Sequence, residues 1–326
     1  RCIRGRRDHR QRPRALVSSR RGPTLAHRAQ YAVLRAFAAL LGLLSWRRAT
    51  ALAGSVGTLF YSPLGIRRRV AERQIAAAFP EFPSREERRV ARESFRHLGR
   101  VAAETALLPR LDASQVRAHI EGIEGLELLG RHASQGGGAI VLTGHLGNWE
   151  LGGAAVAAHG LPVDVVVRLM GNPLFDGYLS RTRLRLGMTV VRDRDAVRHT
   201  ARALRDGHVI AFLIDQSGLH IASSFVNFFG RPAKTPRGPA VLALRLGVPV
   251  FFATSLRLPD GRYRIQVQEI VTERTGDTDR DVDAILNAYS SALEAAVRSA
   301  PEQYFWQHRR WKRQPADTPP ELRDPV

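Results

Sequence analysis

Cysteine is almost absent from this chain of 326 residues, which contains only Cys2. One cysteine allows no disulfide within the chain and no cysteine-rich metal site, and this usage is typical of a reducing compartment. Zinc-binding spacings such as H-E-x-x-H are also absent. We therefore predict neither a metal nor another cofactor.

Several catalytic motifs are missing as well. The chain has no G-x-S-x-G turn, no Walker A loop, and no G-x-G-x-x-G between a strand and a helix. Covalent serine hydrolysis, nucleotide hydrolysis and dinucleotide chemistry therefore lack their usual sequence features.

Charge is dominated by one sign, because 50 Lys and Arg against 30 Asp and Glu give a formal net charge of +20. Such a charge is typical of proteins that bind nucleic acid or an anionic membrane. No recognition helix, zinc finger or RNP-type pattern accompanies the dispersed arginines, so nucleic acid is not predicted as a partner. A merely solvated basic surface, or a non-catalytic basic protein that binds a membrane or nucleic acid, remains an alternative.

Two N-terminal segments precede the main body. Residues 1–28 are rich in Arg, Pro and Ser and predict a disordered basic extension. Residues 29–66 contain two apolar blocks, separated by Arg47 and Arg48 and too interrupted for a simple membrane span of about 20 residues. We interpret 29–66 as a membrane anchor or interfacial hairpin. The alternative is a buried helical hairpin packed on the enzyme body.

The remaining chain predicts one catalytic domain, residues 67–313, followed by a C-terminal tail, residues 314–326. A capping box beginning at Ser84 predicts a helix over 84–107, with Pro109 marking its end. Beyond it, strands and helices alternate. This alternation predicts an α/β fold with a mostly parallel central sheet flanked by helices, behind the N-terminal hydrophobic helical anchor. We expect strands at 139–143, 163–168, 188–191, 209–214 and 248–255, and helices near 149–158, 174–186, 196–206, 238–246 and 281–300.

The most informative pattern is the H-x4-E spacing of His145 and Glu150, which lies where a short apolar strand meets glycines. On a continuous helix the two side chains would lie about 140° apart, so they can meet only if the backbone turns between them. Gly144 and Gly147 allow such a turn, and Asn148 can cap the following helix. The pattern predicts a general base, His145, oriented by the carboxylate of Glu150.

The spacing alone is weak, because His119 and His159 also precede an acidic residue by five positions. Neither follows a buried strand, whereas open α/β sheets build their sites at the carboxyl ends of strands. We therefore favour His145.

Further candidate residues follow other predicted strands. Residues 228–238 form a turn-rich basic segment ahead of a helix and predict an anion cradle for phosphate. Each of these residues has a purely structural alternative. The candidates for substrate binding are Asn148, Arg168, Asn172, Asp215, Gln216, Arg231, Lys234 and Arg237.

Five further segments stand out, in this order: GHLGNWELGG, VRLMGNPLFD, DGHVIAFLIDQSG, VNFFGRPAKTPRGPAVLALRLGVPV and PEQYFWQHRRWK. Together they resemble the bacterial lipid A biosynthesis acyltransferases, also called lauroyl or myristoyl acyltransferases, within the lysophospholipid acyltransferase superfamily. The resemblance covers roughly residues 31–313. The glycine-rich LTGHLGNWE is also similar to mycobacterial phosphatidylinositol mannoside acyltransferases.

This resemblance implies transfer of an acyl chain from acyl carrier protein, or coenzyme A, to a hydroxyl of a phosphorylated glycolipid, most simply a lipid A precursor. Neutral His145 would take the hydroxyl proton and Glu150 would stabilise the imidazolium, without an acyl-enzyme. Loop amides or Arg168 are candidate oxyanion donors. The implied location is the cytoplasmic face of the inner membrane, with membrane lipids as further partners. A phosphatidylinositol mannoside or other lysophospholipid acyltransferase is the alternative.

Overall fold

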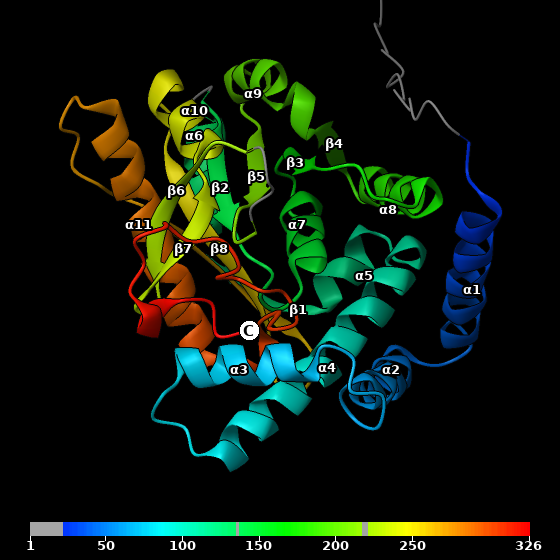
Figure 1. Ribbon diagram of the computed structural model, residues 1–326. Coiled ribbons are helices and arrows are strands. Elements are labelled where there is room, and N and C mark those ends of the chain that lie inside the picture. Colours follow the sequence, from blue (N-terminus) through cyan, green and yellow to red (C-terminus); the bar gives the residue numbers. More distant parts are fainter. Residues whose placement is uncertain (1–21, 135–136, 217–220) are drawn as a thin grey trace, which may run out of the picture.

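The computed structural model of the chain describes residues 22–134, 137–216 and 221–326 (Figure 1). Residues 1–21 of the predicted extension, and the Ser and Gly of the IDQSG segment, lie outside the described residues. The first helix begins at Leu25, inside the segment that the sequence set apart as an extension.

A seven-stranded sheet forms the centre of the molecule, and its strand order is β1-β9-β8-β2-β5-β3-β4. All neighbouring strands are parallel except β8 and β9, which are antiparallel. The predicted mostly parallel α/β sheet is thus confirmed. Its strands are β1 (Ile120–Glu124), β2 (Ala139–Thr143), β3 (Val163–Val167), β4 (Met188–Arg192), β5 (Val209–Leu213), β8 (Val250–Arg257) and β9 (Tyr263–Glu269).

Helices cover both faces of the sheet because side chains alternate along each strand. Ile140 and Leu142 of β2 join a core cluster with α9 (Ala196–Arg205), α10 (Gly238–Leu246) and α11 (Thr278–Ser299). Val141 lies between them in sequence and joins the opposite cluster. That second cluster includes side chains of α5 (Ala113–Ala118), α6 (Leu126–Ser134) and α7 (Trp149–Ala158). Helix α8 (Pro173–Arg185) joins β3 to β4.

The segment 228–238, predicted as a turn-rich loop, contains a strand instead. It contributes β7 (Arg231–Pro236), which pairs antiparallel with β6 (Ser223–Phe228). Phe229 and Gly230 take positive φ angles of 51° and 72° at the turn between them. The hairpin has a buried side, because Val226, Phe228 and Ala233 belong to the core. The burial of these side chains explains why the prediction from turn residues alone was wrong.

Four helices precede α5 and the first strand: α1 (Leu25–Leu41), α2 (Trp46–Tyr61), α3 (Arg68–Ala78) and α4 (Ser84–Leu107). Helix α4 has the predicted bounds, and Pro109 lies in the 3₁₀ turn η1 (Leu108–Arg110) that follows it. The predicted capping box is wrong, since Pro83 is the N-cap residue and no side chain caps the helix.

Helices α2 and α4 approach each other closely at two glycines. A Cβ atom on Gly99 would lie 2.2 Å from the carbonyl oxygen of Ala53, and one on Gly57 would lie 2.3 Å from that of Phe95. Ala49 and Ala53 are buried against α4 with Leu107. One side of α2 therefore belongs to the folded core, as the buried-hairpin interpretation expects.

The other side of α2, with α1 and the turn that follows α2, carries exposed apolar residues. Leu43 is 83% exposed and Leu64 is 59% exposed. Within residues 22–134, 137–216 and 221–326, no helix is both long and apolar enough to cross a membrane. The remaining exposed apolar residues of this region include Val33, Leu40, Leu52, Val56, Leu59, Phe60 and Ile66.

Residues 314–326, set apart as a tail in the sequence, pack against the hairpin. The Gln314 side chain donates to the carbonyls of Pro232 and Leu322, and Arg309 pairs with Asp324 at 2.5 Å. These contacts join the end of the chain to β7.

The close contact between α2 and α4 predicts that Gly99→Ala lowers the free energy of unfolding by about 1–3 kcal/mol, because the new methyl group overlaps a backbone carbonyl. Gly130→Ala in α6 is the matched control, since nothing lies within 4 Å of its Cβ position. The control should be neutral or stabilising by up to about 1 kcal/mol. Urea unfolding in neutral detergent measures both, and an equal effect of the two substitutions would contradict the close approach.

Candidate active site

His145 and Asp215 meet at the carboxyl ends of two adjacent strands. Strands β2 and β5 are parallel and in register, with Thr143 opposite Leu213. Each of the two functional residues follows its strand by two positions, so the register brings them together. The His145 Nδ1 atom lies 2.7 Å from Oδ1 of Asp215, and the His145 backbone N–H donates to Oδ2 at 2.9 Å.

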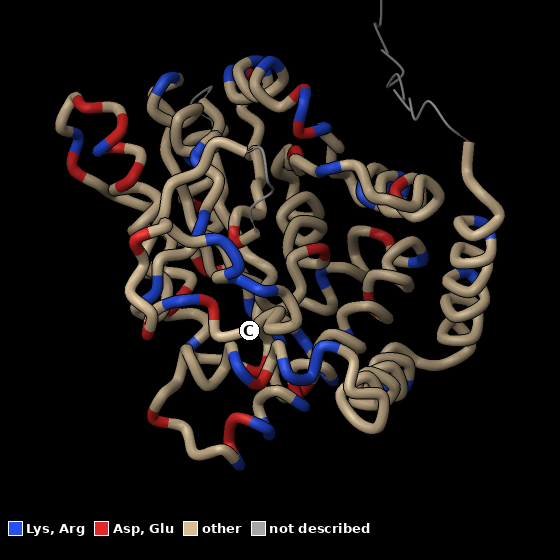
Figure 2. The backbone as a smooth tube through the Cα atoms, viewed as in Figure 1, with Lys and Arg blue, Asp and Glu red and all other residues tan. Residues whose placement is uncertain are grey.

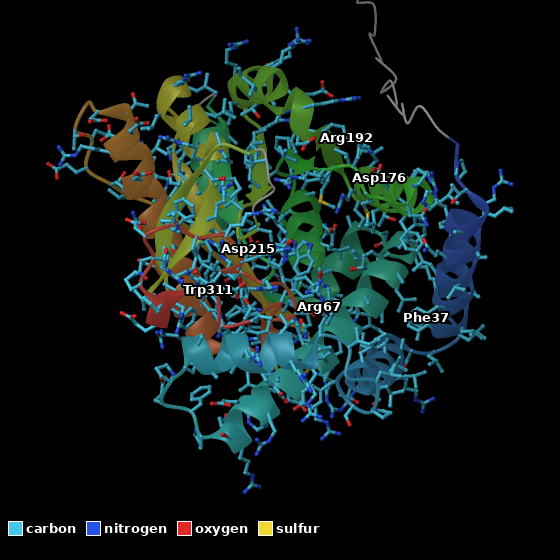
Figure 3. The ribbon with its side chains drawn as sticks, in the orientation of Figure 1. Phe37, Arg67, Asp176, Arg192, Asp215 and Trp311 are labelled. Atoms are coloured by element: carbon cyan, nitrogen blue, oxygen red, sulfur yellow. The ribbon has the colours of Figure 1, made fainter. Side chains whose placement is uncertain are left out.

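The environment of Asp215 keeps its carboxyl ionised. Its side chain is buried in the interior (Figure 3), and only 1% of the residue is exposed. Burial acts to raise the pKa of Asp215, but the charge of His145 and hydrogen bonds from its ring and backbone outweigh burial and hold the pKa below its ordinary value. An ionised carboxylate only accepts hydrogen bonds, so Nδ1 of neutral His145 carries the proton. Nε2 then keeps the lone pair that a general base needs.

The orienting carboxylate differs from the one predicted. Glu150 binds Arg183 through both oxygens, at 2.5 and 2.9 Å, and the contact with the His145 ring comes from Asp215. Glu150 lies in the first turn of α7, where the neighbouring α8 presents Arg183. The predicted pairing of Glu150 with His145 is therefore corrected.

A cavity of about 600 Å³ extends from His145 between the sheet and α7. This volume is within the range of small-molecule sites, roughly 300–1,000 Å³. Its polar part contains the predicted residues His145, Glu150, Arg168 and Gln216, together with Arg183. Its apolar walls come from alternate positions of the strands and from the helices, and include Leu129, Val141, Val156, Val163, Val165, Met188, Val209, Ile265 and Val267. Such a cavity suits a ligand with a long apolar part and a reacting polar end.

Two predicted substrate-binding residues have structural roles. Asn148 is fully buried and caps α7, as predicted, by accepting from the backbone N–H of Leu151 at 3.0 Å. Asn172 caps α8 and donates to the carbonyl of His27 and to Gln30, which joins α1 to α8. Neither residue lines the cavity.

The predicted basic residues are mostly engaged elsewhere. Arg231 donates to the carbonyl of Arg323, and Arg237 pairs with Asp279 at 2.5 Å. Lys234 lies on β7 and, like Arg231 and Arg237, is not part of the cavity wall. Arg168 lies in the wall, half exposed, and its Nε atom is 3.8 Å from the carboxylate of Asp193.

The two other H-x4-acid histidines lie outside the cavity. The His119 ring stacks on Trp46, with 4.2 Å between ring centroids. His159 contacts the carbonyl of Ala155 through Nδ1. Both contacts are structural, which agrees with the preference for His145.

The loop after His145 is held by groups that the sequence analysis missed. Gly147 has a φ of 62°, and a Cβ there would lie 1.9 Å from the Ser255 carbonyl oxygen. Its N–H donates to the Gln303 carbonyl, and the Asn148 N–H donates to that of Ser255. With the His145 amide bound to Asp215, three of the loop amides considered as oxyanion donors are already engaged.

Helix α4 supports the same loop from beneath. His97 Nε2 lies 3.1 Å from the Gly147 carbonyl oxygen, and the Asn148 side chain donates to Glu104 at 2.7 Å. Glu104 also accepts from Tyr263 at 2.5 Å, and all of these side chains are buried. The signal for them in the sequence is faint: polar residues at buried positions of an otherwise amphipathic helix.

The C-terminal segment closes the loop from above. Tyr304 forms a bridge with Leu146, and the Phe305 N–H donates to the His145 carbonyl at 3.1 Å. Burial, together with the charge of Asp215, raises the pKa of the Tyr304 hydroxyl well above its ordinary value. The Trp149 and Phe305 rings lie 4.7 and 6.1 Å from the imidazole of His145. These aromatic side chains restrict the orientations of the imidazole ring.

The sequence profile of the bacterial lipid A biosynthesis acyltransferases matches residues 23–313. The chain belongs to this family. Membership makes the protein an acyltransferase. The candidate site of this lipid A acyltransferase family member is His145, which lines an apolar cavity and contacts the buried Asp215.

Curated relatives agree with this assignment. The chain is similar to the lipid A biosynthesis palmitoleoyltransferase of Escherichia coli K12, with 29% identity over 80% of this chain and 83% of the relative. It is similar to the lipid A biosynthesis lauroyltransferase of the same organism, with 27% identity over 78% and 81%. The phosphatidylinositol mannoside acyltransferase of Mycobacterium tuberculosis H37Rv is 25% identical over 67% and 69%.

The buried His97 predicts a pH-dependent stability. Burial lowers its pKa to about 4, although its contact with Gly147 acts in the opposite direction. The unfolded chain binds this proton below about pH 6.5, whereas the folded chain binds it only near pH 4, so acid favours unfolding over that window. Between pH 7 and pH 5 the His97 contribution to the unfolding free energy should fall by about 2 kcal/mol.

Denaturant unfolding of the native protein and of His97→Gln, at pH 7 and pH 5, measures this contribution. The variant should lose about 2 kcal/mol less on acidification, whereas the difference between the two proteins should stay constant from pH 7 to pH 9. Identical acid sensitivity of the two proteins would show that His97 is not the titrating group.

Proposed function

We propose that this protein transfers a fatty acyl chain from acyl carrier protein, or from coenzyme A, to a hydroxyl of a phosphorylated glycolipid. The acceptor is a lipid A precursor. The observation that carries this proposal is that His145 lies at the polar part of an apolar cavity and contacts the buried Asp215, in a chain of this acyltransferase family.

The reaction needs one base and no covalent intermediate on the protein. The lone pair on Nε2 of His145 takes the proton of the acceptor hydroxyl while the hydroxyl oxygen bonds to the thioester carbonyl carbon. Asp215 stabilises the imidazolium through its contact with Nδ1. The tetrahedral intermediate then expels the thiolate of the donor, and this thiolate receives the proton from the imidazolium.

Glu150 and Arg183 shape the polar end of the cavity without exchanging a proton. Their bidentate pair is largely buried, with 10% and 14% of the side chains exposed. A buried pair of this kind leaves an uncompensated charge when either partner is removed. Substitution of Glu150 therefore acts through the arginine that it neutralises.

The apolar cavity holds the acyl chain, and the depth of its walls limits the chain length. The palmitoleoyl- and lauroyltransferases named above share this family, which supports lipid A precursors as acceptors. The similarity to a phosphatidylinositol mannoside acyltransferase makes that glycolipid the second candidate acceptor.

The proposed location is the cytoplasmic face of the inner membrane. The exposed apolar residues of α1, α2 and the following turn support this location, because a soluble surface rarely leaves so many together in water. Arg47 and Arg48 border this surface and suit anionic lipid headgroups. The helices then lie in the interface without crossing it.

Substitution of the proposed base and of its partner should abolish most turnover. We expect His145→Ala and Asp215→Asn each to lower kcat by about two to four orders of magnitude, because a positioned acid-base group contributes that much. The double variant should be little worse than either single variant, since the two residues act as one unit. His119→Ala is the matched control and should retain activity.

Mass spectrometry of lipid A from a strain that lacks the gene identifies the acceptor. We expect one acyl chain to be missing, to return with the native gene, and not to return with His145→Ala. Loss of a chain from a mannosylated phosphatidylinositol would assign the second candidate acceptor. Full complementation by His145→Ala would contradict the proposed mechanism.

Membrane binding should depend on the exposed apolar residues. We expect Leu43→Asp and Leu64→Asp to reduce flotation of the protein with anionic liposomes, because each places a charge where an apolar side chain meets the bilayer. Point variants are preferable to deletion, since α2 also contributes to the core.

Val271→Asp is the control, because Val271 is 81% exposed and lies beyond β9, outside the surface of α1 and α2. Liposome flotation at low and high salt separates apolar insertion from charge attraction. An equal loss for all three variants, or none for any, would contradict the proposed membrane surface.

A further inference from the structure

The side of His145 that faces the C-terminal segment contains basic groups that the reaction described above does not use. The backbone turns back after Phe305, where the His308 N–H donates to the Phe305 carbonyl at 3.2 Å. This turn brings His308 to the site, where the charges of Asp215 and His145 act on its ring. The ring of His308 has no hydrogen-bond partner within the described part of the chain.

Helix α3 is fixed to this same segment. Gln74 of α3 donates to the carbonyls of Trp306 and His308, both at 2.6 Å, and accepts from the Arg310 N–H at 2.7 Å. These three bonds fix where α3 begins relative to the site. In Figure 2 the basic residues at the start of α3 and those of the C-terminal segment lie near the centre of the view.

Arg67 immediately precedes α3 and is an exposed arginine without an acidic partner among the described residues. Its backbone is left-handed, with φ of 62° and ψ of 7°, a conformation that non-glycine residues seldom adopt. Its charge acts on His308, and both Arg67 and Asp215 lie in the central part of Figure 3. Arg67 thus presents a guanidinium that has no acidic partner among the described residues and lies close enough to His308 for its charge to act on that ring.

Arg310 adds a buried positive charge to the surroundings of His308 and Asp215. Only 5% of the residue is exposed, and its Nε atom has no hydrogen-bond partner within the described residues. Its other nitrogens donate to Lys234 and Thr235, and its charge acts on both Asp215 and His308. The charge of Arg310 compensates that of the ionised Asp215, so the positive charge of Arg67 is left over on this side of the site.

The charge of His308 itself does not contribute at neutral pH. Burial, together with the charges of His145, Arg310 and Arg67, lowers its pKa to about 4, although Asp215 acts in the opposite direction. A neutral imidazole donates one hydrogen bond. The group beside His145 therefore offers one guanidinium and one neutral donor to an anion.

Apolar residues lie next to this anion-binding position. Leu64 and Ile66 precede Arg67 in the turn after α2, and they are 59% and 51% exposed. A ligand bound there would contact a guanidinium and apolar side chains at the same time. That combination favours the phosphate of a lipid over inorganic phosphate, which would leave the apolar side chains without a contact.

We propose that Arg67 and His308 bind a phosphate group of the acceptor lipid beside His145, with the lipid chains lying toward Leu64 and Ile66. The identity of this lipid as the acceptor rests on the proposed function, whereas the affinity of the site for a lipid phosphate does not. Arg168 and Arg237, in contrast, already have the acidic neighbours Asp193 and Asp279.

The first test measures binding without catalysis. The probe is phosphatidic acid in neutral detergent micelles, compared with diacylglycerol in the same micelles. Arg67→Asn removes the charge while keeping a residue that tolerates positive φ. We expect it to weaken phosphatidic acid binding about tenfold or more, since a charge-assisted hydrogen bond is lost. His308→Gln should weaken it by a few-fold.

Arg69→Asn is the matched control, because it removes one exposed positive charge from the first turn of α3, two residues after Arg67. It should change phosphatidic acid binding less than twofold. An equal loss for Arg69→Asn would mean general attraction to an anionic micelle, and no loss for Arg67→Asn would mean that phosphate binds elsewhere. Either result would overturn the proposed site.

The second test places the site in the reaction. The ratio of kcat/KM for a phosphorylated disaccharide lipid to that for its phosphatase-treated form should fall about tenfold in Arg67→Asn and stay constant in Arg69→Asn. An unchanged ratio in Arg67→Asn overturns the acceptor role. If the native protein transfers acyl groups to neither lipid, the proposed function fails, while the micelle measurement still decides on the phosphate site.

Discussion

The contact between Asp215 and His145 is the interaction on which the site depends. Both carboxylate oxygens are engaged, one by the imidazole and one by the backbone amide of the same histidine. A buried carboxylate is stable only when its oxygens find such partners. The two bonds therefore fix the loop and the ring together, and they also fix which nitrogen of the ring faces the cavity. The in-register pairing of β2 with β5 is what makes this contact possible.

A loop that departs from a strand by way of Gly147 has few hydrogen bonds of its own, so the rest of the chain must supply them. They come from α4 below, from β8 at the side, and from the C-terminal segment above. Helix α4 has a second task, because its Gly99 also allows the close approach of α2. One helix thus joins the apolar N-terminal surface to the loop of His145, although the two are far apart in sequence.

Local patterns were sufficient for much of the fold and for half of the pair. The bounds of α4 were predicted from Ser84 and Pro109, although the capping box itself is wrong, and those of α7 from Asn148 as a cap. His145 was recognised as a residue that directly follows a buried strand. Its partner was assigned wrongly because spacing along the chain favours Glu150, whereas Asp215 becomes a neighbour only through the pairing of β2 with β5. Nothing in one sequence states that pairing. The hairpin of β6 and β7 was also missed. The turn residues within 228–238 were given more weight than the weak alternation of apolar and polar residues.

The cavity depends on two glycines in α7 that are unfavourable in a helix. Gly152 and Gly153 lie in this helix, where each glycine is less favourable than alanine by about 1 kcal/mol. Both glycines line the cavity, and a Cβ atom on them would approach Ser255 and Met188 to 3.0 and 3.1 Å. Side chains there would fill the space between the helix and the sheet. The two glycines thus lower the helix propensity of α7 beside His145 and leave room for a ligand. Such a locally unfavourable choice is expected at a functional site and not in an ordinary core.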